Sequence, residues 1–123
     1  ANKQYATQIM ISSYTYAHCK NIVEVRELDT LRVVGKKEVV TVYELLCKKG
    51  GLNPDKKKIL SLFKGGRACY LAREWQNAID KFGEILDMDI NDGPALTYME
   101  RCMDFKQRPP DKKWDGTYIM KDK

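Results

Sequence analysis

The sequence predicts an α+β protein in which β-strands come first and helices follow. Three observations lead to this prediction. β-branched residues are dense in the first third of the chain, apolar residues recur with helical spacing in the second half, and a stretch with charges, two glycines and a proline separates them. Glycine and proline interrupt regular structure, so we place a linker at residues 49–55. The other predicted parts are a strand-rich part at 1–48, a helical unit at 56–106 and a tail at 107–123.

The strand-rich part is expected to contain a β-hairpin. A β-prone run at 7–12 precedes a short helix through residue 20, for which Ser12 or Ser13 is the cap. Two longer β-branched runs, 23–33 and 39–46, flank a Gly-containing turn at 35–38, and an irregularity is expected around Asp29. A hairpin alone is marginally stable, so these strands need a larger sheet or a helical layer.

The second half is expected to form three helices. Asn53 followed by Pro54 is a typical helix start, residues 72–74 interrupt the apolar pattern, and residues 92–94 begin the third helix. The residues expected on the inner faces of the three helices, in order, are Ile59, Leu62, Phe63, Gly66, Cys69 and Tyr70; Trp75, Ala78, Ile79, Phe82, Ile85 and Leu86; and Ala95, Met99, Cys102 and Met103. After the third helix, Asp115 and Gly116 favour a turn, and Trp114 is expected to fold back over an apolar patch.

Composition narrows the class of protein further. The chain has 123 residues, a formal net charge of +5, 43% hydrophobic and 32% charged residues, which excludes collagen-like, mucin-like and wholly disordered chains. No apolar run approaches the ~20 residues that span a bilayer, and the first residues hold no signal-peptide core. We therefore expect a cytoplasmic location and no direct membrane contact. The size argues against a complete enzyme with a large cleft.

Neither the cysteines nor the charges indicate a reactive centre. The four cysteines form no CxxC pair, and the single histidine, His18, has only Cys19 beside it, so we expect buried free thiols and no zinc or redox site. Lysines at 48–49 and 56–58 leave phosphate or nucleic-acid binding as one hypothesis, but no aromatic residues alternate with them. We expect no nucleic-acid partner.

The helical unit resembles a tetratricopeptide repeat. Gly66 in the first helix, and Trp75, Ala78 and Phe82 in the second, match that pattern, whereas Gly65 and Ile90 depart from it. Only one full repeat is present, and repeat arrays need about three to be stable alone. A protein-interaction adaptor that binds a peptide in the helical groove is therefore an alternative function. The Trp75 and Phe82 stripe is expected to be core instead.

Residues 1–46 resemble the C-terminal end of the catalytic domain of class III nucleotide cyclases (adenylate or guanylate). The matching segments are 1–12, 26–29, 32–36 and 40–45. In that family they form the last helix, a strand, a short helix and the closing hairpin. The expected fold is thus an incomplete ferredoxin-like cyclase sheet followed by a three-helix tetratricopeptide-like unit. Three further segments, 92–94, 101–102 and 109–116, are similar to the ends of bacterial adenylate cyclases that carry such a tail.

This resemblance implies a parent enzyme that converts ATP to cyclic AMP and diphosphate in signalling, and whose relatives include membrane-anchored proteins. The metal-binding aspartates and the transition-state Asn and Arg of the family precede the matched segment. This chain is therefore expected to be non-catalytic, structural or regulatory, with no cofactor of its own, while the parent uses ATP with Mg²⁺ or Mn²⁺. A hairpin lysine of the family contacts substrate phosphates; its position is Val34 here, and Lys36 is the candidate phosphate contact.

The expected partners follow from the same resemblance. Strand edges of an incomplete sheet favour self-association, strand exchange or binding to the remainder of the cyclase. The helical unit is expected to brace the hairpin.

Overall fold

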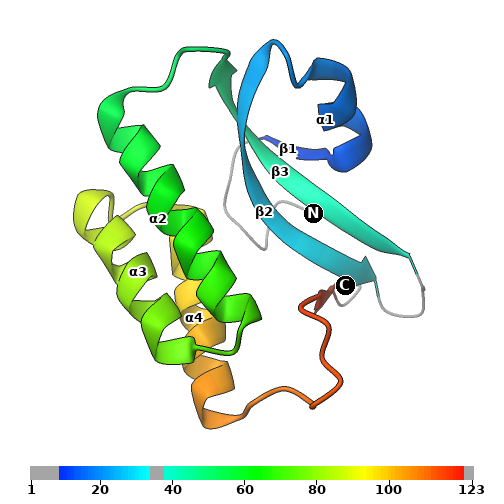
Figure 1. Cartoon of the computed structure of the whole chain (residues 1–123), viewed down its shortest axis with the longest axis vertical. Coiled ribbons are helices and arrows are strands. Elements are labelled where there is room, and N and C mark those ends of the chain that lie inside the picture. The colour runs from blue at the N-terminus through cyan, green and yellow to red at the C-terminus, as the bar shows by residue number, and fades with distance from the viewer. Residues whose placement is uncertain (1–8, 34–37, 121–123) are drawn as a thin grey trace. The chain divides into compact units, whose positions relative to one another are not determined.

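A computed structural model of the chain describes residues 9–33 and 38–120 (Figure 1). The chain divides into two compact units. The sheet unit contains residues 9–52 and 113–120, and the helical unit contains residues 53–112. The predicted α+β class is confirmed, because the first unit holds the strands and the second holds only helices.

The sheet unit is built on a long hairpin. β2 (Val23–Val33) and β3 (Val39–Lys48) pair antiparallel, β1 (Met10–Ser12) lies antiparallel along the other side of β3, and β4 (Tyr118–Met120) lies parallel to β2. The strand order is β1-β3-β2-β4. A hairpin with strands on both sides satisfies the need for a larger sheet that the sequence indicated.

The short helix α1 (Ser13–Cys19) follows β1 directly. The side chain of Ser12 caps it by accepting a hydrogen bond from the Thr15 amide, which confirms the predicted capping serine. Tyr16 of α1 packs on Tyr43 of β3, with ring centroids 4.6 Å apart. The helix is thereby held against the hairpin.

The predicted irregularity in the hairpin lies just before Asp29. The pairing of β2 with β3 shifts between Glu24 and Val25 and again between Glu27 and Asp29, so Leu28 is an extra residue in β2. Leu28 is fully buried. Bulges of this kind increase strand twist and redirect side chains, and here the bulge places an apolar side chain inward.

The helical unit consists of α2 (Pro54–Leu71), α3 (Trp75–Met88) and α4 (Gly93–Gln107), and α2 and α3 form a helical hairpin (Figure 1). The predicted N-cap is confirmed at Asn53, which accepts from the Lys56 amide at 2.7 Å. The third helix begins where it was predicted, and Asp92 caps it by accepting from the Ala95 amide at 3.2 Å. Each cap is followed within two positions by a proline, whose fixed φ suits the first helical turn.

α2 ends in a Schellman motif with an unusual residue. The amides of Arg73 and Glu74 donate to the carbonyls of Tyr70 and Cys69, and Arg73 takes the left-handed conformation at φ 64°. Glycine usually occupies this position, because other residues are strained there. The guanidinium of Arg73 donates to the backbone carbonyls of Pro110 and Asp111, which ties the segment after α4 to this turn.

The core of the helical unit is largely the predicted one, with one error. Ile59, Phe63, Tyr70, Ala78, Phe82, Ile85, Ala95 and Cys102 are buried, together with Tyr98. Met103 was expected on the inner face of α4 but is 52% exposed. Ala95, Tyr98 and Cys102 recur three and four residues apart and form the buried stripe, so Met103 points away from it.

The C-terminal strand was not predicted. Residues up to 112 belong to the helical unit, and the segment that follows belongs to the sheet unit, where it ends in β4. No helix in the described ranges is long and apolar enough to cross a membrane.

Candidate functional site

The candidate phosphate contact, Lys36, lies outside the described residues, as do Val34 and Lys37. The structure describes the hairpin up to Val33 and again from Glu38. The described residues that hold the two strands on either side of positions 34–37 form the candidate site.

A buried ion pair joins the two long strands. Arg26 and Glu44 are direct cross-strand partners, and the Arg26 Nε and Nη2 both contact Glu44 Oε1, at 2.8 and 2.7 Å. The Arg26 side chain is 2% exposed and that of Glu44 is 15% exposed. A charge with so little access to water depends on its partner, so this pair specifies the register of the hairpin.

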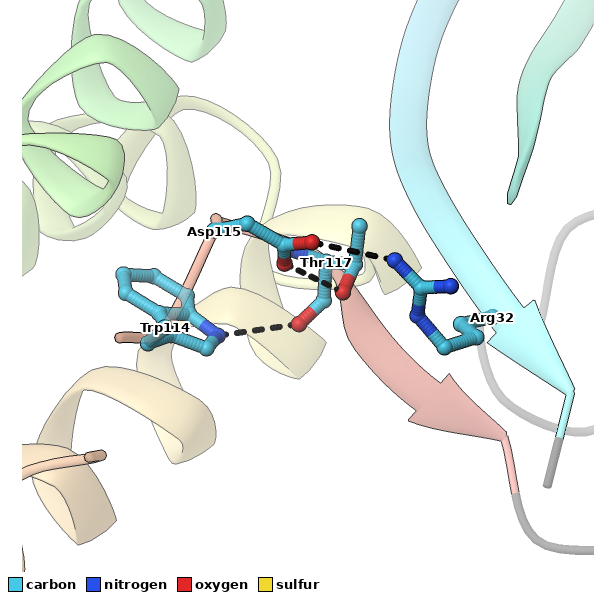
Figure 2. Close-up of polar contacts among 4 residues, drawn as sticks. All are labelled: Arg32, Trp114, Asp115 and Thr117. Carbon is cyan, nitrogen blue, oxygen red and sulfur yellow. Dashed lines mark hydrogen bonds and ion pairs between the residues drawn. The ribbon is translucent and has the colours of Figure 1, made fainter. Parts of the chain in front are cut away.

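A second polar group fixes the end of β2 that leads into the turn (Figure 2). Arg32 Nη2 donates to Asp115 Oδ2 at 3.0 Å. Asp115 Oδ1 in turn accepts from the amide and the hydroxyl of Thr117, at 3.0 and 2.6 Å. The indole of Trp114 donates to the Thr117 carbonyl at 2.9 Å. We call residues 114–117 together with Arg32 the C-terminal corner.

The corner confirms the predicted turn at Asp115 and Gly116. Gly116 has φ 90°, a conformation that glycine adopts without strain, and Asp115 closes the turn through Thr117. These bonds hold the pKa of Asp115 at about 2, below its ordinary 3.8, and the largest cause is the Thr117 hydroxyl, followed by the Thr117 amide and Arg32. Asp115 is thus charged throughout the physiological range.

The described residues do not supply a metal centre. Within 9–33 and 38–120, no three His, Cys, Asp or Glu side chains lie together so that they could hold a metal ion.

The aromatic side chains of the helical unit form its core, as predicted for the Phe82 stripe. The ring of Tyr98 lies 4.9 to 5.4 Å from those of Tyr70, Phe82 and Phe63. Trp75 is half-buried, and its ring centroid lies 5.2 Å from that of Phe105. A peptide-binding groove lined by Phe82 receives no support, because that side chain is fully buried.

All four cysteines are free thiols, as expected, and all lie in described residues. The expected burial is confirmed only for Cys102 and is wrong for Cys19, Cys47 and Cys69, which are half-buried. Burial raises the pKa of Cys102 to about 12, with Arg101 opposing this change and Cys69 adding to it. His18 donates through Nδ1 to the Tyr14 carbonyl at 2.9 Å, within α1.

One curated protein gives a functional comparison. The chain is 29% identical over 108 residues to "Adenylate cyclase, terminal-differentiation specific" from Dictyostelium discoideum. The match covers 82% of this chain and 5% of the relative, so the chain spans a small part of that protein. No protein-family model matches the chain, and no solved structure matches it. This similarity indicates that the matched part of the chain is related to a region of an adenylate cyclase.

Sequence reasoning missed two parts of this site. The Arg26–Glu44 pair could not be recognised in the sequence, because its charged residues alternate with apolar ones just as they do on a strand with one solvated face. The Arg32–Asp115 pair joins residues 83 positions apart, and no local pattern reports such a contact. The acidic residue of a tight turn beside a short apolar run was the one available signal for the corner.

Proposed function

We propose that this chain is the C-terminal part of a class III adenylate cyclase catalytic region with a tetratricopeptide-like helical appendage. The parent enzyme would convert ATP to cyclic AMP and diphosphate in the cytoplasm, and this chain would serve it structurally and as a regulator. The observation that carries the proposal is the element order strand, short helix, hairpin in the sheet unit, together with the similarity to the Dictyostelium enzyme.

The chemistry of cyclisation supports a non-catalytic role. Two cations held by aspartates would have to activate the ribose hydroxyl and neutralise the phosphates. Three of the described carboxylates serve other purposes: Glu44 neutralises Arg26, and Asp92 and Asp115 close a helix start and a turn.

The contacts within the hairpin are suited to positioning a side chain toward a bound phosphate. The Arg26–Glu44 pair fixes the middle of the two strands, and the C-terminal corner fixes Arg32, four positions before Lys36 in the sequence. A lysine on a turn acts as a point charge toward phosphate, so its usefulness depends on how well the strands beneath it are held. We propose that Lys36 reaches a phosphate of ATP in the intact parent.

A chimera tests the proposal. The region of the Dictyostelium cyclase that matches this chain is replaced by this chain's residues, and cyclic AMP formation from ATP is measured with Mg²⁺ and with Mn²⁺. We expect an active chimera. A chimera that carries Glu44→Ala should lose activity because the hairpin register is no longer held, whereas Glu38→Ala, at an exposed residue beside the turn, should retain it. A folded but inactive chimera would contradict the proposal.

The chain alone provides a second measurement. Incubated with ATP and either metal, it should form no cyclic AMP. Metal-dependent formation of cyclic AMP by the purified chain would overturn the non-catalytic role. The adaptor remains the alternative function, and Phe82, which would line its groove, is fully buried.

A further inference from the structure

The edge of β2 is completed by a segment distant in sequence. Leu31, Arg32 and Val33 pair in parallel with Tyr118, Ile119 and Met120. Among the described residues this parallel pairing covers three positions, and parallel ladders are slightly weaker per residue than antiparallel ones. The stability of β4 at this edge thus depends on additional contacts.

The segment that ends in β4 contains a turn that its own residues stabilise. Trp114 bonds to the Thr117 carbonyl, Asp115 bonds to the Thr117 amide and hydroxyl, and Gly116 makes the turn, so these contacts are internal to residues 114–117 (Figure 2). The strand ladder and the Arg32–Asp115 pair then join the segment to β2. A segment whose turn is held by its own residues can keep that shape when it binds elsewhere.

Both partners of the ion pair are accessible to solvent. The Arg32 side chain is 31% exposed and that of Asp115 is 53% exposed, so water and salt screen their attraction. Upstream, Pro109 and Pro110 follow the end of α4, and a turn at Lys112 and Lys113 leads into the segment. The segment therefore follows a turn, and its ion pair with Arg32 is screened by solvent.

We propose that the β2 edge at Leu31–Val33 is a strand-accepting site for residues 114–120 of a second copy of this chain, so that two copies exchange their C-terminal strands. The partner's binding segment is known, because a second copy carries the same turn at Gly116, the same Asp115 carboxylate and the same strand, Tyr118–Met120. The exchanged contacts are identical to the internal ones, as in domain swapping. This inference does not depend on the proposed cyclase function.

Concentration decides which form dominates. Because the contacts are the same, the exchanged form has to compete only with the effective concentration of the tethered segment, which is roughly millimolar for short connections. The monomer is favoured when the chain is dilute, and the exchanged dimer grows as the chain concentration approaches that value.

Charge reversal provides the test. In Arg32→Asp, two carboxylates face each other within one chain, and in Asp115→Arg, two guanidinium groups do. In an equimolar mixture, exchange pairs the arginine introduced at 115 with the aspartate introduced at 32, and it pairs the native Arg32 with the native Asp115. We expect each variant alone to be monomeric and the mixture to form a heterodimer, measured by size exclusion with light scattering and by native mass spectrometry.

The double variant Arg32→Asp/Asp115→Arg is the matched control, because it restores an attractive pair within one chain. It should behave as the wild type does. A mixture that stays monomeric while the double variant shows a restored β4 by hydrogen exchange would overturn the proposal.

The unmodified chain is measured in parallel, so that the outcome does not depend on the variants folding. Its dimer fraction should rise from micromolar to millimolar concentration and fall when a synthetic peptide of residues 113–120 is added in excess. A dimer that resists the peptide, or a chain that remains monomeric at millimolar concentration, would contradict strand exchange.

Discussion

The ring of Phe82 fills the space in which a side chain on Gly66 would begin. A Cβ at Gly66 would lie 2.8 Å from Cζ and 2.9 Å from Cε1 of that ring, closer than such atoms approach in proteins. Phe82 is fully buried and also packs edge-on against Phe63, so the ring has no free volume into which it could move. The close approach of α2 and α3 therefore depends on the missing side chain.

Gly66→Ala is expected to destabilise the chain. Alanine has a higher helix propensity than glycine, but the steric strain of overpacking a dense core is larger than this gain. We therefore expect the free energy of unfolding to fall by about 1–2 kcal/mol. Gly65→Ala is the matched control, because its Cβ would meet the flexible Lys81 stem at 3.2 Å. This variant should be neutral or more stable by up to ~1 kcal/mol. Urea unfolding measures both, and equal stability of the two variants would show that the α2–α3 approach is not tight.

The Arg26–Glu44 pair predicts an asymmetry between removing one charge and removing both. Glu44→Ala leaves Arg26 buried without its carboxylate and should cost about 3 kcal/mol, the low end for a buried pair, because Glu44 is 15% exposed. The apolar replacement Arg26→Met/Glu44→Leu should lie within about 1 kcal/mol of the wild type. Thermal and urea unfolding provide the measurement.

The exposed Glu38 gives the control for this pair. Glu38→Ala removes a carboxylate of the same kind at the exposed residue just before β3 and should alter stability by less than about 0.5 kcal/mol. If Glu44→Ala changed the free energy of unfolding as little as Glu38→Ala does, the cross-strand pair would not be what holds the hairpin.

Local signals explain which elements the sequence could predict. Asn53 and Asp92 are each followed by a proline and an apolar helical stripe, and both helix starts lie where these signals place them. The end of α2 was predicted from a break in the stripe, but its left-handed Arg73 was not, because that position favours glycine. The guanidinium contact to Pro110 and Asp111 is a tertiary reason for an arginine there.

Long-range pairing explains what the sequence could not predict. A three-residue run such as Tyr118–Met120 has no hairpin partner nearby, and its register is set by Leu31–Val33. The candidate site is affected in the same way, since Arg32 and Asp115 become neighbours only through that pairing. Lys36, which the cyclase resemblance indicated, stays a prediction outside the described residues.

The thiols should differ in reactivity. Only the thiolate is alkylated rapidly, and burial both hides Cys102 and raises its pKa to about 12. We expect iodoacetamide at pH 8 to modify Cys102 only in denaturant, whereas the half-buried Cys19 and Cys47 react in the native chain. Mass spectrometry of the alkylated peptides gives the rates. Native modification of Cys102 at the rate of Cys19 would mean that α4 opens locally.

The C-terminal corner should weaken in acid. The pKa of Asp115 is lowered in the folded chain, so its contribution to stability is present above about pH 4 and is lost as the pH falls from 3.8 toward 2. Carboxyl NMR titration should give the wild-type value. Thr117→Val should raise it more than Arg32→Gln does, because the Thr117 hydroxyl is the largest cause of the lowering. The reverse order would assign the low pKa to the ion pair, and the turn would then depend on β2 for its shape.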